Sequence, residues 1–351
     1  MSISKPPLPR TLSPIQWQFV VIFFGLTGLV AYAVSKFTSG SLVVVITAVG
    51  IVGCVIALVI LALRLKTFGR IVRTVIVSLL AVIAGTYFIL FAAIYFFQDA
   101  IANQTSSFFQ PRTMSVEAAQ ALTAPDVTAV DLPAPGGVHL HGWLVRSTTE
   151  ARSPLVIYFG GSGSEASAMI PLAQNLTGWS VAVINYRGFG LSEGIPSHAN
   201  VLADALFIYD TLAARGDIDA DRVVAMGYSL GTGVAVHLSE QRPAAGTILV
   251  SPYDRWSLVG LKRPPLYTPL SGILTPYFDS ISRAPGITTP MLCLIGSADA
   301  FVPPELSVRL ASAWGGATKV ITYPGEDHGL LFHNNSSGAD IAAFLHSIES
   351  K

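Results

Sequence analysis

Hydrophobic residues gather in three long runs near the start of the chain, at residues 15–37, 42–63 and 74–97. Each run is long enough to cross a hydrocarbon core of about 30 Å as a helix, which takes roughly 20 residues. None of the runs contains Asp or Glu, and Lys36 lies at an end where its side chain can reach the headgroups. The pattern predicts a membrane anchor of three transmembrane helices within residues 1–97.

A signal peptide and a set of buried soluble helices both fit these runs less well. The apolar core of a signal peptide spans only about 7–15 residues, and buried helices of soluble proteins usually keep a polar stripe. The runs also contain no His, so they offer no side chain for a proton or ion path. The anchor is therefore not expected to act as a transporter.

After a polar connector at residues 98–125, short apolar runs alternate with helical stretches. Short apolar runs between turn residues are typical of strands. The predicted strands are 127–132, 138–145, 155–159, 181–186, 223–228, 247–251, 291–295 and 319–323, and the predicted helices are 165–177, 197–215, 230–241, 304–314 and 339–348. The first two strands form a predicted hairpin. The later ones predict a mostly parallel, doubly wound α/β domain over residues 126–351.

Composition and charge support this division into a membrane part and a soluble part. The chain is 51% hydrophobic and only 12% charged, whereas about 25% is typical of globular proteins. The first 98 residues hold seven basic residues and no acidic one, which leaves 14 basic and 21 acidic residues in the rest. This balance excludes a basic nucleic-acid-binding protein. The two cysteines, Cys54 and Cys293, lie in separate apolar runs and predict no disulfide framework.

The basic residues also predict an orientation in the membrane. Four of them, Arg64, Lys66, Arg70 and Arg73, lie between the second and third apolar runs, and the N-terminal tail adds two more. The positive-inside rule places both segments in the cytoplasm. Three spans then carry the α/β domain to the periplasmic or extracytoplasmic side, in a multi-pass protein of a bacterial inner membrane.

The segment Gly227-Tyr228-Ser229-Leu230-Gly231 joins a predicted strand to a predicted helix. In this position a G-x-S-x-G sequence is typical of a serine nucleophile on a strained turn, with glycines that permit tight backbone packing. The start of the helix favours negative charge that develops during attack on a carbonyl. Ser229 is therefore the candidate nucleophile.

A serine nucleophile needs a base and an orienting acid, which in this kind of fold follow it in the order acid, then His. Asp299 follows the strand 291–295, and His328 follows the strand 319–323. Because the carboxyl ends of parallel strands meet at one sheet edge, both side chains are expected near Ser229. Alternatives stay open at this stage: Asp254 as the acid, and His333 as the base. Asp327, next to His328, is expected to have a capping or surface role.

Acyl transfer also requires hydrogen-bond donors for the oxyanion. One is expected from the backbone N–H of Leu230, and the other from the glycine-rich loop 159–163. Neither this loop nor the glycine-rich segment 188–194 fits a nucleotide-binding pattern. His139 and His141 alternate on one predicted strand, but no third ligand lies nearby in the sequence, so a solvated strand face is expected rather than a metal site.

Five segments in this order, 159–163, 185–190, 227–231, 296–299 and 327–328, resemble the α/β-hydrolase superfamily, specifically its small-cap ABHD-type serine hydrolases. The resemblance spans residue 126 to the C-terminus and excludes the three-run segment. It implies Ser229 as nucleophile, Asp299 as acid and His328 as base. It also implies an oxyanion hole made by the N–H groups of Ser162 and Leu230. One departure is that Gly160 stands where the family usually has His.

The sequence therefore predicts a membrane-anchored serine hydrolase that cleaves a carboxylester or thioester through an acyl-enzyme, with no metal or cofactor. Its expected partners are a small-molecule acyl substrate, amphiphiles included, and the lipid bilayer, and not nucleic acid. A serine peptidase or an acyltransferase with the same triad is the alternative among enzymes. A non-catalytic membrane protein with a ligand-binding hydrolase-like domain is the alternative from another class.

Overall fold

A computed structural model describes residues 109–146, 150–256 and 278–349, together with Gly69, Thr74, Ser78 and Gly85. The chain divides into two units, Met1–Tyr95 and Phe96–Lys351. Apart from three isolated positions in the last run, the predicted membrane spans at 15–37, 42–63 and 74–97 lie outside the described residues. Within the described part of the chain, no helix has the length and apolar character needed to cross a bilayer. The three-helix anchor remains a prediction.

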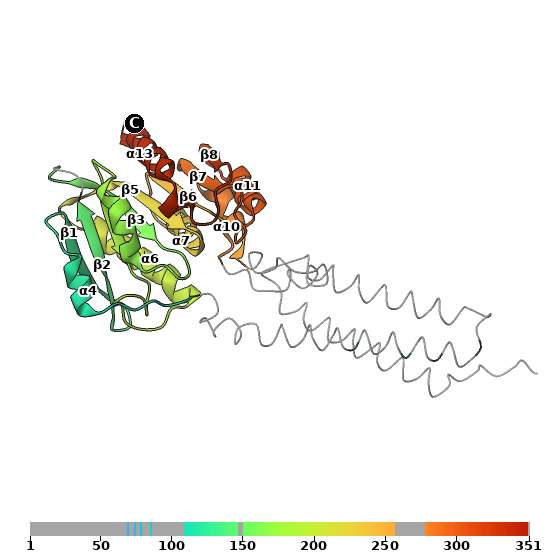
Figure 1. Ribbon diagram of the computed structural model, residues 1–351, viewed down its shortest axis with the longest axis horizontal. Coiled ribbons are helices and arrows are strands. Elements are labelled where there is room, and N and C mark those ends of the chain that lie inside the picture. Colours follow the sequence, from blue (N-terminus) through green and yellow to red (C-terminus); the bar gives the residue numbers. More distant parts are fainter. Residues whose placement is uncertain are drawn as a thin grey trace, which may run out of the picture. The chain divides into compact units, whose positions relative to one another are not determined.

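The second unit is built on one sheet of eight strands in the order β1-β2-β4-β3-β5-β6-β7-β8 (Figure 1). The strands are β1 (Val127–Ala134), β2 (Val138–Arg146), β3 (Ser153–Phe159), β4 (Ser180–Ile184), β5 (Ile218–Tyr228), β6 (Gly246–Val250), β7 (Met291–Gly296) and β8 (Thr318–Tyr323). β1 and β2 form the predicted hairpin, and β2 is also antiparallel to β4. The other neighbours are parallel, which confirms the predicted α/β-hydrolase-type fold.

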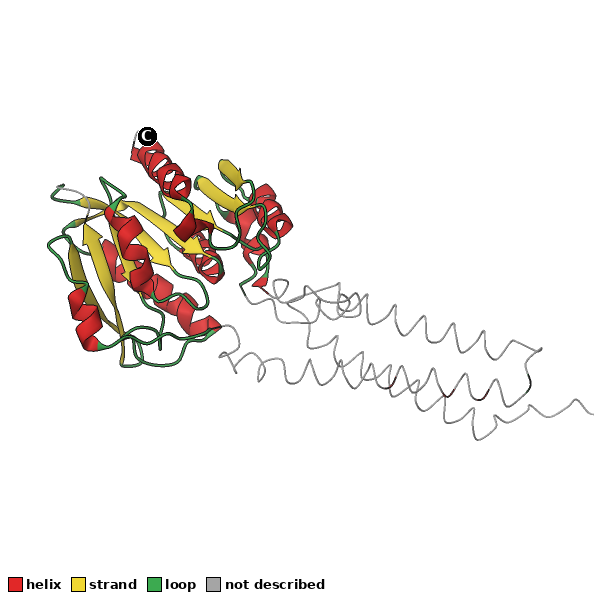
Figure 2. Cartoon of the chain, in the orientation of Figure 1, coloured by secondary structure: helices red, strands yellow, loops and turns green. Residues whose placement is uncertain are grey.

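Helices cover both faces of the sheet, as Figure 2 shows. They are α4 (Val116–Ala121), η2 (Ala166–Met169), α5 (Ile170–Gln174), α6 (His198–Ala213), α7 (Leu230–Gln241), α10 (Ser280–Arg283), η4 (Ala284–Gly286), α11 (Pro304–Ala313), α12 (Leu330–His333) and α13 (Asn335–Glu349). Buried residues of α6, α7 and α11 share one hydrophobic core, and those of α4, α5 and α13 share the other. The sheet therefore separates two apolar layers, each of which excludes water from one strand face.

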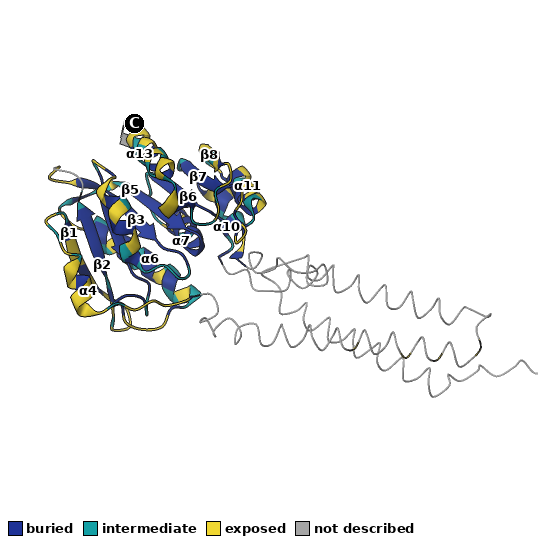
Figure 3. Cartoon of the chain, viewed as in Figure 1, coloured by how far each residue is buried: buried dark blue, intermediate teal, exposed yellow. Residues whose placement is uncertain are grey.

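Four inner strands are buried along their whole length, whereas the two edge strands, β1 and β8, are not (Figure 3). Every residue of β3, β4, β6 and β7 is buried, which explains why the sequence shows them as continuous apolar runs. β8 pairs only with β7, and five of its six residues are exposed or half-buried. The loops that follow β3, β5, β7 and β8 all leave from the carboxyl edge of the sheet.

β5 begins at Ile218, five residues before the predicted start of this strand at residue 223. Ile218 is buried, but three of the four residues that follow it are charged, and Arg222 forms an ion pair with Asp219 there. Ile218 pairs with Ser153 across a register shift. Residues 219–222 are exposed or half-buried and form no apolar run, so a pattern of hydrophobic residues alone does not reveal this part of the strand.

α6 begins at a buried contact with the segment that follows residue 277. The Nε2 atom of His198 accepts a hydrogen bond from the Phe278 N–H at 3.1 Å, and its ring meets the Phe278 ring edge-on at 4.6 Å. Burial, with the nearby Arg283 and His237, lowers the pKa of His198 to about 4. The neutral ring is therefore the form that the fold requires, because a protonated Nε2 has no lone pair to accept this hydrogen bond.

We expect the stability of the domain to depend on pH through His198. Its pKa rises from about 4 in the folded chain to about 6.5 in the unfolded one. The unfolded chain thus binds the proton more readily between these pH values, so stability is complete above about pH 6.5 and declines as the pH falls toward 4. The measurement is the free energy of unfolding in urea at pH 7 and at pH 5. From pH 7 to pH 5 this free energy should fall less for His198→Gln than for the wild-type chain. Equal losses in the two chains would contradict this assignment.

Candidate active site

Ser229 sits on a sharp turn between β5 and α7, in a backbone conformation that side chains rarely adopt. Its φ is 52° and its ψ is −121°, which for a residue other than glycine costs on the order of 1–3 kcal/mol. Three hydrogen bonds hold the turn: the Ser229 N–H donates to Val250 O at 2.9 Å, and the N–H and hydroxyl of Thr232 donate to Ser229 O at 3.0 and 2.7 Å. The strained turn presents the Ser229 hydroxyl at the carboxyl edge of the sheet.

Two glycines make this turn sterically feasible. A Cβ on Gly227 would lie 2.4 Å from Gly231 O, and a Cβ on Gly231 would lie 2.0 Å from Phe159 O. Real Cβ atoms do not approach so closely, so any side chain here would push the strand, the helix and the loop after β3 apart. The G-x-S-x-G spacing is thus a packing requirement of the turn as well as a sequence signature.

The same contacts bring the predicted oxyanion loop to the start of α7. A Cβ on Gly161 would lie 3.2 Å from the Tyr228 ring, so this loop passes directly beside the residue that precedes Ser229. Ser162 O accepts the Gln110 N–H at 2.7 Å, which fixes one side of the loop. Leu230 is the first residue of α7, where the N–H has no acceptor within the helix. Ser162 and Leu230 therefore lie in segments packed against each other beside Ser229.

The structure brings Ser229, His328 and Asp299 together in one hydrogen-bonded chain. His328 Nε2 lies 2.8 Å from Ser229 Oγ, and His328 Nδ1 lies 2.7 Å from Asp299 Oδ2. The carboxylate accepts a hydrogen bond from the Nδ1–H group, which leaves Nε2 as the acceptor for the serine hydroxyl. Ser229 is 2% exposed and the Asp299 side chain 2%, whereas the His328 side chain is 24% exposed. Of the three, the imidazole is thus the most open to solvent.

Asp299 is held in its ionised form by four hydrogen-bonding and electrostatic contributions. Burial alone acts to raise its pKa, but the hydrogen bond and charge of His328 and the N–H groups of Val302 and Phe301 outweigh burial and lower it. Both N–H groups donate to Oδ1 at 2.8 Å, while Oδ2 faces His328. An ionised, fixed carboxylate orients the imidazole and stabilises its protonated form.

The alternative acid, Asp254, is engaged elsewhere. Its carboxylate is buried, and Oδ2 accepts from Arg309 Nε at 2.8 Å while Oδ1 accepts from the Arg255 N–H at 2.6 Å. Asp327 is exposed, and its Oδ1 accepts the Gly329 N–H in a turn. The alternative base, His333, lies in the last turn of α12, where its N–H donates to Gly329 O. The contacts in the structure therefore favour Asp299 as the acid and His328 as the base.

Two aromatic residues beside His328 have no role that the sequence pattern predicts. The Tyr228 hydroxyl donates to His328 O at 2.9 Å, and its ring lies 5.4 Å from the imidazole. Burial, and then the charges of Asp299 and Asp327, raise the pKa of Tyr228 to about 12, so its hydroxyl remains a donor. The Phe301 ring lies 4.9 Å from the imidazole on the other loop. The signal that the sequence offers for them is position: Tyr228 directly precedes the candidate nucleophile, and Phe301 follows the candidate acid by two residues.

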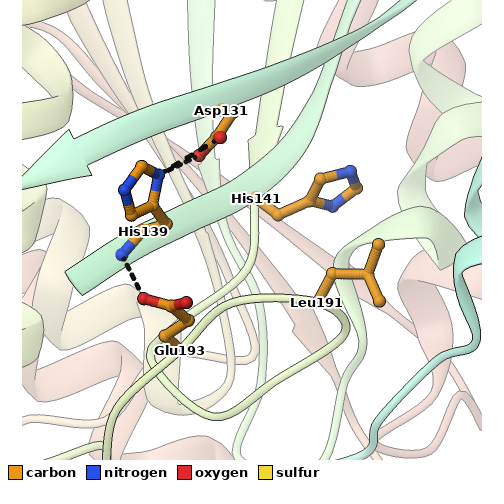
Figure 4. A pocket seen from close by; sticks show the side chains of 5 residues that line it. All are labelled: Asp131, His139, His141, Leu191 and Glu193. Carbon is orange, nitrogen blue, oxygen red and sulfur yellow. Dashed lines mark hydrogen bonds and ion pairs between the residues drawn. The ribbon is translucent and has the colours of Figure 1, made fainter.

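His139 and His141 line a separate shallow pocket with Asp131, Leu191 and Glu193 (Figure 4). His139 is exposed, its Nδ1 lies 3.0 Å from Asp131 Oδ1, and its N–H donates to Glu193 Oε2. Burial lowers the pKa of His141, against the opposing charges of Asp131 and Glu165. Across residues 109–146, 150–256 and 278–349, no group of three or more His, Cys, Asp or Glu side chains is arranged to hold a metal ion.

Family models and curated relatives match the part of the chain that carries this site. The model of a family described as serine aminopeptidase, S33, matches residues 150–283, and that of a TAP-like protein matches residues 275–350. Uncharacterized protein Rv2307c of Mycobacterium tuberculosis is 34% identical over 194 residues, which cover 55% of this chain and 69% of the relative. The alpha/beta hydrolase domain-containing protein WAV2 of Arabidopsis thaliana is 30% identical over 188 residues, 48% of this chain and 60% of the relative.

Solved structures with the same fold include esterases. An esterase of Pyrococcus furiosus superposes with a TM-score of 0.55 at 18% identity, over 69% of this chain and 97% of the esterase. Est1E of Butyrivibrio proteoclasticus, solved with ferulic acid bound, superposes with a TM-score of 0.54 at 19% identity, over 63% of this chain and 100% of Est1E. At these identities the likeness establishes the fold alone.

The packing around the turn predicts that Gly231→Ala destabilises the domain. In an ordinary helix this change is favourable, but here the new methyl would meet Phe159 O at 2.0 Å. We expect a loss of about 1–3 kcal/mol in the free energy of unfolding, as for other overpacked sites. Gly216→Ala is the matched control, because nothing lies within 4 Å of a Cβ there. Thermal unfolding of both variants checks this, and equal melting temperatures would contradict it.

Proposed function

The chain belongs to the α/β-hydrolase superfamily, and we propose that it is a serine hydrolase that cleaves a carboxylester or thioester through an acyl-enzyme. The observation that carries the proposal is the unbroken chain of hydrogen bonds from Ser229 Oγ through His328 to Asp299. Its geometry is that of an activated nucleophile, a base within hydrogen-bond reach and a third group that orients the base.

Each step of the proposed reaction has a group to perform it. His328 Nε2 takes the Ser229 proton as Oγ attacks the carbonyl carbon, and Asp299 stabilises the imidazolium. The N–H groups of Leu230 and Ser162 receive the negative oxygen. The tetrahedral intermediate then collapses, and His328 gives its proton to the departing oxygen or sulfur. Water repeats the sequence with His328 as base, and this releases the acid and restores the Ser229 hydroxyl.

A peptidase is the second candidate, because one matching family model carries the description serine aminopeptidase. The same triad serves amide cleavage, which requires His328 to protonate a leaving amine. An acyltransferase would replace the second water with an alcohol or amine acceptor. A purely ligand-binding domain has no use for a strained Ser229 within 2.8 Å of an imidazole, so we rank it below the three enzymatic candidates.

We further propose that residues 1–97 anchor the enzyme in a bilayer. The support lies in the sequence: three apolar runs without acidic residues, and a basic segment between the second and third. The proposed anchor would hold the hydrolase domain beside a membrane on its periplasmic or extracytoplasmic side. Acyl substrates, amphiphiles among them, would then be reached from the lipid surface.

Ser229→Ala should abolish both hydrolysis of aryl esters and labelling by a fluorophosphonate probe, because no other hydroxyl is bonded to His328 Nε2 among the interactions of the described residues. His328→Ala should reduce turnover about as far. Asp299→Asn should cost on the order of 10⁴ in kcat, as the corresponding change does in serine proteases.

Asp254→Asn is the control for the acid, because its carboxylate bonds to Arg309 and not to His328. Full-length variants are compared by kcat on one aryl ester and by probe labelling, after thermal unfolding shows that each is folded. Substantial turnover in Ser229→Ala would refute the mechanism. A near-normal Asp299→Asn beside a crippled Asp254→Asn would show that the acid is misassigned.

The proposed topology predicts the outcome of reporter fusions. A periplasmic reporter such as alkaline phosphatase, fused after Gln98, should be active, because three spans place that residue outside. A fusion between Arg64 and Arg73 should be inactive with the same reporter. The opposite pattern would refute the orientation. If the reporter fused after Gln98 needs only one of the first two apolar runs for its activity, fewer than three runs span the membrane.

A further inference from the structure

Six aromatic and imidazole rings form a continuous row across the candidate active site. Ring centroids lie 5.0 Å apart between Tyr253 and Trp256, 6.4 Å between Trp256 and Phe301, 4.9 Å between Phe301 and His328, 5.4 Å between His328 and Tyr228, and 5.3 Å between Tyr228 and Phe332. His328 is the member of this row that is hydrogen-bonded to Ser229. His328, the proposed base, is therefore an inner member of this row, with a ring contact to Phe301 and another to Tyr228.

Phe301 differs from the other large ring that touches His328 because it remains open to solvent. It is 47% exposed, whereas Tyr228 is 7% exposed. Its backbone is nevertheless fixed: the N–H donates to Asp299 Oδ1 at 2.8 Å, and the next side chain, Val302, is 1% exposed. An exposed benzyl ring held at a set distance from a catalytic-type imidazole is a ready surface for an apolar group of a ligand.

The chemistry of ester cleavage indicates which part of the substrate meets this ring. His328 Nε2 must pass its proton to the leaving oxygen, so that oxygen has to lie within about 2.6–3.2 Å of Nε2. The atoms bonded to the leaving oxygen then extend over the surroundings of the imidazole. Among the described residues with a ring contact to that imidazole, Phe301 is the exposed one.

We propose that Phe301 is a specificity residue that binds the leaving group, an inference that rests on the proposed function. The substrates it selects are uncharged esters of aromatic or bulky apolar alcohols, whose leaving group can pack on the Phe301 ring. Small alkyl alcohols lack the surface for this contact.

The test compares two esters with the same acyl group, phenyl acetate and methyl acetate, on the full-length chain. Phe301→Ala keeps the backbone N–H that donates to Asp299 and removes only the ring. Aromatic pairs contribute about 0.5–1.5 kcal/mol, so the ratio of kcat/KM for phenyl over methyl acetate should fall roughly two- to tenfold. Phe301→Tyr, which retains a ring, should keep the wild-type ratio.

Deacylation supplies an independent readout. Both esters give the same acetyl-enzyme, from which the leaving group has already departed, so the rate of acetyl-enzyme hydrolysis in Phe301→Ala measures any effect of the lost ring on His328 separately from leaving-group binding. Phe332→Ala is the matched control, because Phe332 is 42% exposed and contacts Tyr228 rather than His328. It should not change the ratio of the two esters.

Three outcomes would overturn the inference. An equal loss of kcat/KM for both esters in Phe301→Ala, with slower deacylation, would make Phe301 a positioning residue for His328. An unchanged ratio would show that the leaving group does not contact the ring. A similar fall of the ratio in Phe332→Ala would show that the change in ratio does not depend on a ring contact with His328. Failure of the wild-type chain to react with a fluorophosphonate would instead refute the proposed function itself.

Discussion

The arrangement of the candidate site depends on one backbone constraint, the positive φ of Ser229 between β5 and α7. A serine accepts this conformation only where its surroundings leave no alternative, and here three backbone segments close around it. Gly227 meets the carbonyl of Gly231, and Gly231 meets the carbonyl of Phe159. Ser229, the start of the helix and the loop that follows β3 are therefore fixed by the same contacts. The free-energy cost of the turn is offset by the buried strands and helix on either side of it.

Most of the sheet follows from the sequence because its strands are buried on both faces. Continuous apolar runs mark β3, β4, β6 and β7, and the turn residues around them locate their ends to within two residues. The helix predicted at residues 165–177 is instead a short η2 followed by α5, with a proline near the start of α5. Length and turn type in such short elements depend on how they pack, and a hydrophobic pattern contains little information about that.

The candidate site is less fully determined by the sequence. Chain order and the ends of the predicted strands favour Ser229, Asp299 and His328, but they leave Asp254 open as an alternative acid. The choice depends on Arg309, which is 55 residues away from Asp254 in the chain and pairs with it in space. The sequence pattern does not identify Phe301 and Tyr228 for a similar reason. Their importance lies in ring contacts with His328, which form only in the folded chain. Residues 1–97, in contrast, are interpreted from hydropathy and charge alone.

The three members of the hydrogen-bonded chain rest on parts of the sheet that differ greatly in burial. Ser229 follows the central strand β5, whereas His328 follows β8, an edge strand that is largely exposed. Elements with few buried contacts open locally at a lower free energy than the core does. The Tyr228 hydroxyl, bonded to His328 O, ties the edge loop back to the central strand. On gentle heating, the alignment of His328 with Ser229 would thus be lost while the core is still intact, so the lifetime of this hydrogen-bonded chain is set by the edge of the sheet.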